Sequence, residues 1–294
     1  MDAETRRRRL KIALAARRAL LAPGAGNALT ARIIEDLGFE TIYLTGAGLA
    51  NTSLGVPDIG LVTLSELAET TAAIADATTL PLLVDADTGF GNALNMVRTV
   101  RALERAGAMA IQIEDQVFPK RCGHFADKEI IPAAEMVDKL KAAADARRSE
   151  DILLIARTDA RAIEGFDSAV ERTLRYLAAG ADATFVEAPV SKDELAEIPR
   201  RIALPQVANM VVGGKTPLAS QKELAAMGFS LVIYANAALQ ASVLAMQEVL
   251  GALRADGSLD RVANRLASFS ERQRVVGKAQ WDALEARFAA SRKN

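Results

Sequence analysis

Cysteine and histidine are almost absent from this sequence. Its 294 residues contain one of each, Cys122 and His124. A single cysteine cannot form an intrachain disulfide and fits a reducing compartment, so we expect a cytoplasmic protein. One cysteine and one histidine also cannot complete the tetrahedral ligand set of a zinc site.

Excess charge and long hydrophobic runs are lacking too. The formal net charge is −1, so no overall field attracts nucleic acid or a membrane surface, and we expect neither as a partner. No apolar run approaches the ~20 residues needed to span a bilayer. Residues 1–21 are rich in arginine, but charged residues interrupt their apolar part, which favours an amphipathic first helix over a signal peptide. A mitochondrial presequence is the alternative, which the early acidic residues and the lack of serine disfavour.

Short apolar runs alternate with helical patterns through most of the chain. The runs are rich in valine, isoleucine and leucine without polar alternation, which is typical of strands buried on both faces. We expect strands at 20–22, 41–45, 81–85, 108–114, 152–157, 183–187, 205–209 and 231–234. We expect helices at 30–37, 64–75, 93–106, 133–148, 168–179, 217–227, 241–253, 259–268 and 278–290. Glycines expected to end helices are Gly38, Gly107, Gly180 and Gly228.

Eight strands in strict alternation with helices favour a closed parallel (β/α)₈ barrel of the TIM type, with a doubly wound open sheet as the alternative. The length of 294 residues suits such a barrel, which typically needs about 250. We see no linker that divides the chain. We therefore expect one barrel domain over residues 1–294, in which residues 238–294 form a C-terminal helical extension.

Polar residues follow almost every expected strand at its carboxyl end. In a (β/α)₈ barrel this rim is where active sites are built, whereas charges inside a strand are costly to bury unpaired. The residues that share this position are Thr45, Gly46, Asp85, Asp87, Glu114, Asp115, Arg157, Thr158, Asp159, Glu187, Asn209 and Asn236. The sequence therefore predicts an active site at the rim.

Three acids follow two neighbouring strands. Asp85 and Asp87 end one strand and Glu114 ends the next. Carboxylates crowded together repel unless a hard cation lies between them, and Mg²⁺ takes oxygen ligands while keeping several waters. We expect Mg²⁺ here, with Mn²⁺ as an alternative ion; the competing interpretation is a set of helix caps and salt bridges.

Lys120, Arg121, Cys122, Gly123 and His124 are consecutive and form the densest cluster of reactive side chains. Neighbouring cations lower the pKa of a thiol, which makes it a usable proton donor or nucleophile. The glycine allows the backbone to fold tightly around a ligand. The stretch lacks any helix or strand pattern, so we expect a loop over the rim. The alternative is an inert, buried cysteine.

Three further features could bind an anion. Arg157 ends an otherwise apolar strand and offers a planar fork suited to a carboxylate, unless it is a structural partner of Glu187. The glycine-containing turn at 43–48 could hold a carboxylate by its N–H groups, or be no more than a tight turn. Residues 213–215, Gly-Gly-Lys, follow the seventh strand, where barrels often bind an anionic group.

Together these residues resemble the phosphoenolpyruvate mutase/isocitrate lyase superfamily over nearly the whole chain. The matching pieces are 26–39, 43–48, 53–58, 84–89, 113–124, 156–159, 187–189 and 209–217. The string 120–124, Lys-Arg-Cys-Gly-His, marks the lyase branch, which includes isocitrate lyase, 2-methylisocitrate lyase and 2,3-dimethylmalate lyase. Enzymes named carboxyvinyl-carboxyphosphonate phosphorylmutase look similar.

The resemblance implies roles for residues of this chain. The Mg²⁺ ligands, some acting through water, would be Asp85, Asp87 and Glu114. The groups that hold the 2-hydroxy or 2-oxo acid end would be Tyr43, Thr45, Gly46, Ala47 and Arg157, with Asp58 nearby. The general acid/base would be Cys122 on a gating loop, supported by Lys120, Arg121 and His124, and Gly123 would bind substrate. The far side of the pocket would be completed by Glu187 and Asn209. The resemblance also implies a homotetramer in which C-terminal helices swap between neighbours, giving the apolar stripe at 281–288 a partner.

Two departures from the lyase pattern concern the pocket. Residues 45–47 read Thr-Gly-Ala, where lyases often have serine followed by two glycines. Residues 210–217 look closest to the dimethylmalate lyase type, although Val212 stands where an acid is common. A third substrate carboxylate would lack familiar contacts, which favours a dicarboxylate.

The resemblance therefore predicts a Mg²⁺-dependent lyase that cleaves a carbon–carbon bond in a small 2-hydroxy di- or tricarboxylate and releases pyruvate or glyoxylate. Phosphorylmutase or oxaloacetate hydrolase activity on the same metal site is the alternative. A non-catalytic metabolite-binding barrel is a third possibility of a different class. A Schiff-base aldolase would need a lysine within a barrel strand, and none of the expected strands contains one.

Overall fold

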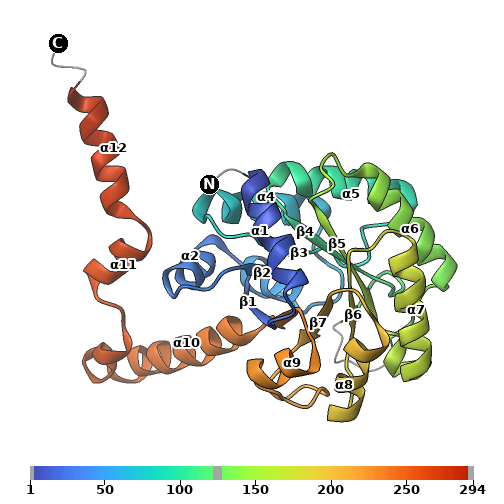
Figure 1. Cartoon of the computed structure of the whole chain (residues 1–294). Coiled ribbons are helices and arrows are strands. Elements are labelled where there is room, and N and C mark those ends of the chain that lie inside the picture. The colour runs from blue at the N-terminus through green and yellow to red at the C-terminus, as the bar shows by residue number, and fades with distance from the viewer. Residues whose placement is uncertain (1–2, 122–127, 291–294) are drawn as a thin grey trace.

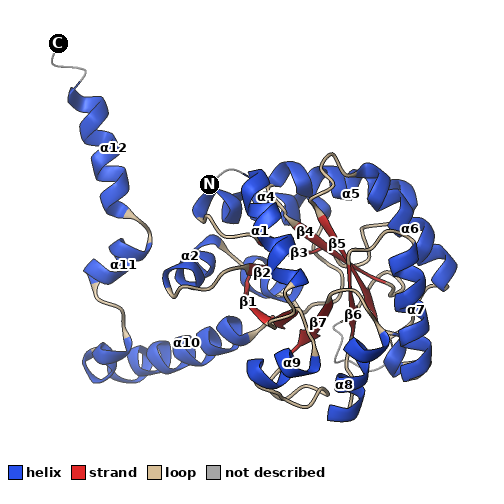
Figure 2. Ribbon diagram, viewed as in Figure 1, coloured by secondary structure: helices blue, strands red, loops and turns tan. Residues whose placement is uncertain are grey.

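Eight parallel strands form a closed barrel in the order β1 to β8, and helices surround it (Figures 1 and 2). The structure is a computed structural model that describes residues 3–121 and 128–290. The strands are β1 Leu20–Ala25, β2 Ile42–Leu44, β3 Leu82–Asp85, β4 Ala110–Glu114, β5 Leu153–Thr158, β6 Ala183–Val186, β7 Gln206–Asn209 and β8 Leu231–Tyr234. The expected TIM-type barrel is confirmed, and the open sheet is excluded because β1 pairs with β8 from Leu20 opposite Leu231.

Most helices connect one strand to the next. Those in the first half are α1 Ala3–Ala15, α2 Ala28–Asp36, α3 Gly46–Leu49, η1 Ala50–Leu54, α4 Leu64–Ala77, α5 Ala93–Ala106 and α6 Ala133–Ala146. Those in the second half are η2 Ala160–Ala162, α7 Phe166–Ala178, α8 Lys192–Arg201, α9 Gln221–Met227, α10 Ala237–Asp256, η3 Asp260–Arg265, α11 Phe269–Val275 and α12 Lys278–Ala290. Within the described residues no helix is long and apolar enough to cross a membrane.

The expected helix at 259–268 is only partly present. Its place is taken by the short 3₁₀ helix η3, after which Leu266 has an extended backbone. A new helix, α11, begins after Ser268, whose side chain accepts a hydrogen bond from the backbone N–H of Glu271. Serine favours such N-caps because its oxygen satisfies an otherwise unpaired N–H. Here the cap signal divides a segment that its apolar spacing alone would join.

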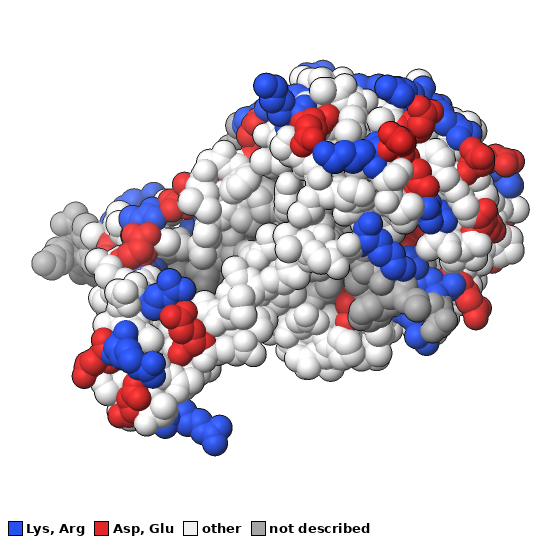
Figure 3. All heavy atoms as spheres, turned by 90° about the horizontal axis from the view of Figure 1, so that it is seen from below, with Lys and Arg blue, Asp and Glu red and all other residues white. Residues whose placement is uncertain are grey.

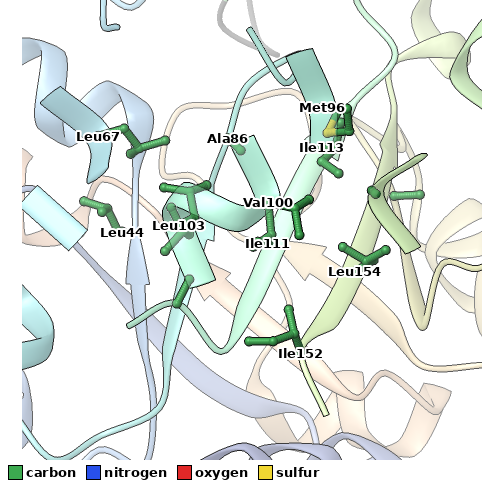
Figure 4. Packing of buried hydrophobic residues seen from close by; sticks show 14 of the residues in the cluster. Leu44, Leu67, Ala86, Met96, Val100, Leu103, Ile111, Ile113, Ile152 and Leu154 are labelled. Atoms are coloured by element: carbon green, nitrogen blue, oxygen red, sulfur yellow. The ribbon is translucent and has the colours of Figure 1, made fainter. Parts of the chain in front are cut away.

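Alternate residues of each strand face two different cores. Leu83 faces the barrel interior, whereas its neighbour Val84 packs outward against the helices. Figure 4 shows the outer core, in which Val100 and Leu103 of α5 lie against Ile111 of β4. Burial on both faces explains why the strands read as continuous apolar runs.

The amino end of the barrel is covered by α1, which confirms the expected first helix. Its apolar side buries Leu10 and Leu14 in the same cluster as Leu20 and Met109 from the strands. Arg8 and Arg9 on the other side are exposed. The arginine-rich start is therefore a helix with one buried apolar side and a solvated basic side.

The C-terminal helices leave the barrel as an arm. In Figure 1, α10 runs outward from the barrel, and α11 and α12 lie beside it rather than over either end. Arg274 of α11 makes two hydrogen bonds to Asp36 of α2, at 2.7 and 2.6 Å. The large apolar side chains of the arm remain exposed: Leu244, Leu250, Phe269, Trp281 and Phe288. The extension expected at 238–294 thus contributes little to the barrel's own core.

Candidate active site

The carboxyl ends of the strands line a small polar cavity. Ten of the residues singled out in the sequence line it: Tyr43, Thr45, Ala47, Asp58, Asp85, Lys120, Arg157, Glu187, Asn209 and Asn236. Apolar residues that the sequence reasoning did not include as site residues also line it: Val211, Ile233 and Ala235. Segments spread over almost 200 residues of sequence meet here because all eight strands run in one direction.

The three predicted metal ligands lie at this end. Asp85 is the last residue of β3, and Asp87 has a left-handed backbone with φ of 48°. Such a conformation is uncommon outside glycine and often marks a functional position. The backbone N–H of Glu114 donates to the carbonyl of Asp87 at 2.9 Å, so the ends of β3 and β4 are tied together.

A buried ammonium group sits among the acids. Lys120 Nζ lies 2.5 Å from Asp58 Oδ1 and 2.8 Å from Asp87 Oδ1. Burial lowers the pKa of Lys120, but Asp87 and the other acids outweigh it and hold this pKa well above its usual value. Burial raises the pKa of Asp87 to about 6, although Lys120 opposes the shift. Lys120 therefore stays charged and compensates part of the acid cluster.

Arg157 forms the other half of the site. Its Nη1 lies 3.1 Å from Glu114 Oε2, and its Nε and Nη2 donate to the two oxygens of Asp159 at 3.0 and 3.1 Å. Glu187 lies further away, 4.0 Å from Nε. The alternative partnership with Glu187 is thus present as a long ion pair, whereas Asp159 and Glu114 hold the fork more closely. Burial raises the pKa of Glu114 well above its usual value, against the opposing effect of Arg157.

Gln112, which the sequence reasoning missed, connects two site residues. Its Nε2 donates to the hydroxyl oxygen of Tyr43 at 2.9 Å and to Asp85 Oδ1 at 3.2 Å. Burial, followed by the negative charge of Asp85, raises the pKa of Tyr43 well above its usual value, so the phenol stays neutral. A lone polar side chain within an apolar strand run is the signal that could have identified Gln112.

The glycine-containing turn is a helix start whose N–H groups are partly engaged. Thr45 caps α3, and its side-chain oxygen accepts from the N–H of Gly48 at 3.3 Å. The N–H of Gly46 points to Asp85 Oδ2 at 3.4 Å. The turn therefore holds the carboxylate of Asp85, one of the expected metal ligands, and also forms part of the cavity wall. The spacing of the residues in the sequence did not reveal this contact.

The acid cluster fits a hard divalent cation held partly through water. A Cβ added to Gly46 would lie 3.1 Å from Asp87 Oδ1 and 3.5 Å from Asp85 Oδ2, so glycine keeps the space beside both acids open. Glu114 Oε1 is buried and has no hydrogen-bond partner within residues 3–121 and 128–290. In those same residues no three acidic, histidine or cysteine side chains converge closely enough to bind one ion directly. Mg²⁺ tolerates this because it commonly retains several waters.

The wall formed by β7 and β8 is neutral. Asn209 and Asn236 each have a side-chain oxygen that is buried without a hydrogen-bond partner in the described part of the chain. Val211, Ile233 and Ala235 add apolar surface beside them. Residues 213–215 are not among the residues that line the cavity. A ligand would meet amide and apolar groups on this side.

The expected loop is described up to Arg121. Lys120 is buried at the cavity, whereas Arg121 is exposed and lines a separate hollow. The backbone N–H and carbonyl of Arg121 are both bonded by the side-chain amide of Gln116, at 2.9 and 2.8 Å. Cys122, Gly123 and His124 lie outside the described residues.

A closed parallel barrel with buried acids, an ammonium group and an arginine fork in one cavity defines an α/β-barrel enzyme site suited to small carboxylates. A family model described as phosphoenolpyruvate phosphomutase matches residues 10–254. The chain belongs to this phosphoenolpyruvate mutase/isocitrate lyase superfamily and is an enzyme of its lyase branch. The 2,3-dimethylmalate lyase of Eubacterium barkeri is 43% identical over 279 residues, which cover 95% of this chain and 96% of that protein. The 2-methylisocitrate lyase of Aeropyrum pernix is 45% identical over 267 residues, covering 91% and 86%.

Solved structures show the same fold. A crystal structure of 2,3-dimethylmalate lyase matches with a TM-score of 0.90 at 34% identity, covering 96% of this chain and 94% of that one. Oxaloacetate acetylhydrolase bound to 3,3-difluorooxalacetate matches with a TM-score of 0.87 at 33% identity, covering 93% and 92%. Phosphonopyruvate hydrolase bound to oxalate and Mg²⁺ matches with a TM-score of 0.87 at 34% identity, covering 97% and 99%. The fold thus accommodates lyases and hydrolases, and one relative of this chain binds Mg²⁺.

Proposed function

We propose that this enzyme is a Mg²⁺-dependent lyase that cleaves the C2–C3 bond of a small 2-hydroxy dicarboxylate. The observation that supports this most is the single cavity in which the fork of Arg157 lies beside Glu114, close to Asp85 and Lys120. Mn²⁺ is an alternative ion, since both take oxygen ligands. The ligands would be Asp85, Asp87 and Glu114, partly through water.

When bound, a divalent ion would supply Lewis acidity toward the oxygen at C2 and the neighbouring carboxylate. The chain's own groups bind and orient the substrate. Arg157 pairs with the carboxylate at C1 through the guanidinium N–H groups of Nη1 and Nη2 beyond those directed at Glu114 and Asp159. Asp58 lines the cavity beside Lys120, and we assign it the proton of the C2 hydroxyl. The electrons of that O–H bond then form the C=O of the product keto acid.

The electrons of the broken C2–C3 bond remain on C3, next to a carboxylate. This carbanion needs positive charge nearby and then a proton. The ammonium group of Lys120 is buried in the cavity and remains charged, so it can supply the first. Cys122 would donate the proton, with Arg121, Gly123 and His124 from the same loop in support. Exclusion of water would protect the carbanion while it exists.

The cavity favours a dicarboxylate of the 2-alkylmalate type over a tricarboxylate such as methylisocitrate. Its two cationic lining residues in the described chain are Lys120 and Arg157, and both already face acids. The opposite wall offers the amides of Asn209 and Asn236 and apolar groups that suit an alkyl substituent. Because of this wall, Glu187 and Asn209 are proposed to contact the departing half of the substrate.

A substrate screen tests the reaction. Purified enzyme with Mg²⁺ is given 2-alkylmalates, methylisocitrate, isocitrate and oxaloacetate while pyruvate and glyoxylate release is followed. Pyruvate from a malate with a methyl group at C2 is the expected result, and chelation by EDTA should abolish it. Phosphorus NMR with phosphonopyruvate tests phosphorylmutase activity, and acetate and oxalate formation tests oxaloacetate hydrolysis. Turnover of those compounds alone would replace the lyase proposal, and ligand binding without turnover of any of them would support a non-catalytic barrel.

We further propose a cytoplasmic homotetramer in which residues 238–294 extend one barrel domain and dock on neighbouring subunits. A large groove, lined in part by α2 and α10, has an apolar lining that includes Leu29, Ile33, Val243 and Met246. Figure 3 shows few charged residues on the face between arm and barrel. Exposed apolar surface of this extent is typical of an interface. A second copy's arm, with its exposed Trp281, offers matching apolar side chains.

The only tryptophan makes the assembly measurable. Trp281 is 64% exposed in the single chain. Burial in a partner would shift its fluorescence emission to shorter wavelength, and light scattering would give four times the chain mass of 31.3 kDa. Phe288→Glu should move the emission to longer wavelength and lower the mass from light scattering. Leu94→Glu, which changes an exposed apolar residue of α5, should alter neither. A solvent-exposed tryptophan in a monomer would overturn the assembly.

A further inference from the structure

A second buried lysine pairs with the acid that follows β5, and the proposed mechanism does not use it. Lys128 Nζ is 2.5 Å from Asp159 Oδ1, and the two side chains are 2% and 0% exposed. Burying two charges is costly unless they are paired with good geometry and further hydrogen bonds. Because both side chains are buried, this ion pair cannot serve solubility or surface charge, and its cost must be offset by another role.

Asp159 is the residue through which Lys128 meets the site. Both oxygens of Asp159 accept hydrogen bonds from the guanidinium group of Arg157. The backbone N–H of Asp159 donates to Asp115 Oδ1 at 2.9 Å, and Asp115 is itself held by Tyr176 at 2.7 Å. Asp159 is thus held by Arg157, Lys128 and Asp115, so its carboxylate can fix the orientation of the arginine fork.

The charge balance explains why a lysine is needed there. Arg157 faces three buried carboxylates, namely Glu114, Asp159 and Glu187. A substrate carboxylate would add a fourth negative charge to one guanidinium group. Lys128 places a second positive charge on Asp159, so that less of the positive charge of Arg157 is compensated before a ligand arrives.

Lys128 also joins the fork to the segment that carries Lys120. The two sides of this segment are paired, because Val117 N–H donates to the carbonyl of Glu129 and Ile131 N–H to that of Asp115, each at 2.9 Å. The Lys128–Asp159 pair therefore connects this paired segment to the end of β5. Arg157 is thus tied, through Asp159 and Lys128, to the same paired segment that carries Lys120.

We propose that Lys128 and Asp159 are positioning residues for Arg157. They fix the orientation of its guanidinium group and leave more of its positive charge available to a substrate carboxylate. The inference rests on the proposed function only in taking Arg157 as the carboxylate-binding group. It is tested by ligand binding rather than turnover. A failure of the lyase chemistry would leave this test intact.

Calorimetry with oxalate and Mg²⁺ is the direct measurement, and thermal midpoints are recorded for each variant. Lys128→Met should weaken oxalate binding about tenfold, the size typical of groups that orient a ligand-binding residue. Lys128→Arg keeps the charge and should restore binding to within about threefold of the wild type. The matched control is Arg147→Met, which removes the ion pair with Asp182 at the amino end of the barrel (2.7 Å). It should lower the thermal midpoint and leave oxalate affinity unchanged.

A double-mutant cycle separates positioning from general structural damage. If Lys128 acts through Arg157, then Lys128→Met in an Arg157→Lys background should cost little further oxalate affinity, because the fork is already gone. A purely structural role would give additive losses. Should Lys128→Met fail to fold, Asp159→Asn replaces it in the same cycle, with the same expected loss and the same non-additivity. Unchanged oxalate affinity in a folded variant, or additive losses, would overturn the proposal.

Discussion

The two ends of this barrel are built from the same strands and differ in almost every physical respect. At the amino end, α1 lays Leu10 and Leu14 over the apolar ends of the strands. At the carboxyl end, buried acids and cations crowd a small cavity: Asp85, Asp87, Glu114, Lys120, Arg157, Asp159 and Glu187. Apolar burial stabilises the first end, whereas desolvated charge destabilises the second unless it is paired.

The difference assigns opposite roles to the two ends. The carboxyl end holds strained and charged groups in place, such as Asp87 with its left-handed backbone, and depends on the rest of the molecule for that. The amino end has no comparable cavity of charged groups in the described chain and supplies packing. Substitutions at the carboxyl end should therefore change chemistry most, and those at the amino end should change stability most.

The largest effect is expected for Cys122, the proton donor proposed to serve the site at the carboxyl end. Replacement by alanine or serine removes the proposed proton donor and should lower kcat by about 10²–10⁴-fold, the usual contribution of general acid–base catalysis. Oxalate and Mg²⁺ binding, followed by calorimetry, should remain close to wild type because the groups proposed to bind them are untouched. Equal losses of binding and turnover would instead indicate that the loop binds substrate.

The amino end should show the reverse pattern. Leu14→Ala leaves a cavity under α1 and should lower the free energy of unfolding by about 2–5 kcal/mol, measured by urea titration. Ile12→Ala on the exposed side of the same helix should change it by no more than about 0.5 kcal/mol. Keto-acid release by either folded variant should match the wild type. A drop in turnover without unfolding would show that the two ends are coupled.

The destabilising effect of buried charge at the carboxyl end can be measured at Asp87, as a dependence of the free energy of unfolding on pH. Burial raises its pKa from 3.8 to about 6. A carboxyl group with a raised folded-state pKa contributes stability that is full below pH 4 and is lost as pH rises through 6, here about 3 kcal/mol in total. Asp87→Asn should therefore gain stability relative to wild type, by that amount, between pH 4 and 7 in EDTA.

Asp36 is the matched control for this sign. It is exposed, and its hydrogen bonds to Arg274 lower its pKa. Its contribution is present above the unfolded-state pKa and is lost as pH falls through the folded-state value. Asp36→Asn should consequently lose stability relative to wild type as pH rises from 3 to 7. If the stability difference from wild type changed with pH in the same direction for both variants, the buried Asp87 carboxyl group would not be the destabilising group proposed here.

The smallest effect is expected for an exposed ion pair at the amino end. Arg18 makes two hydrogen bonds to Glu40, at 2.7 and 2.5 Å, and both side chains are about half exposed. Arg18→Met should change the free energy of unfolding by no more than about 1 kcal/mol, because water and salt screen such pairs. Urea titrations at low and high salt would reveal a larger contribution.

Local patterns predicted the fold well where hydrophobic burial determines it. All eight strand positions and the barrel followed from apolar runs that must be buried on both faces. Patterns failed where tertiary contacts or capping decide. The 3₁₀ helix η3 interrupts an expected helix, and no helix was expected at 192–201, where α8 begins after Ser191 and runs through Pro199. Spacing likewise gave no sign of the π-helical turn η1 beyond the glycine-containing turn.

For the site, the sequence by itself determined which chemical groups stand at the carboxyl ends of the strands, because chain order and strand direction bring those ends to one rim. Only the tertiary structure decided which groups pair. It joined Lys120 to Asp58 and Asp87, brought the fork of Arg157 closer to Asp159 than to Glu187, and paired Lys128 with the same Asp159. Pair choice depends on distances of a few ångströms between segments far apart in the chain, and no local spacing encodes them.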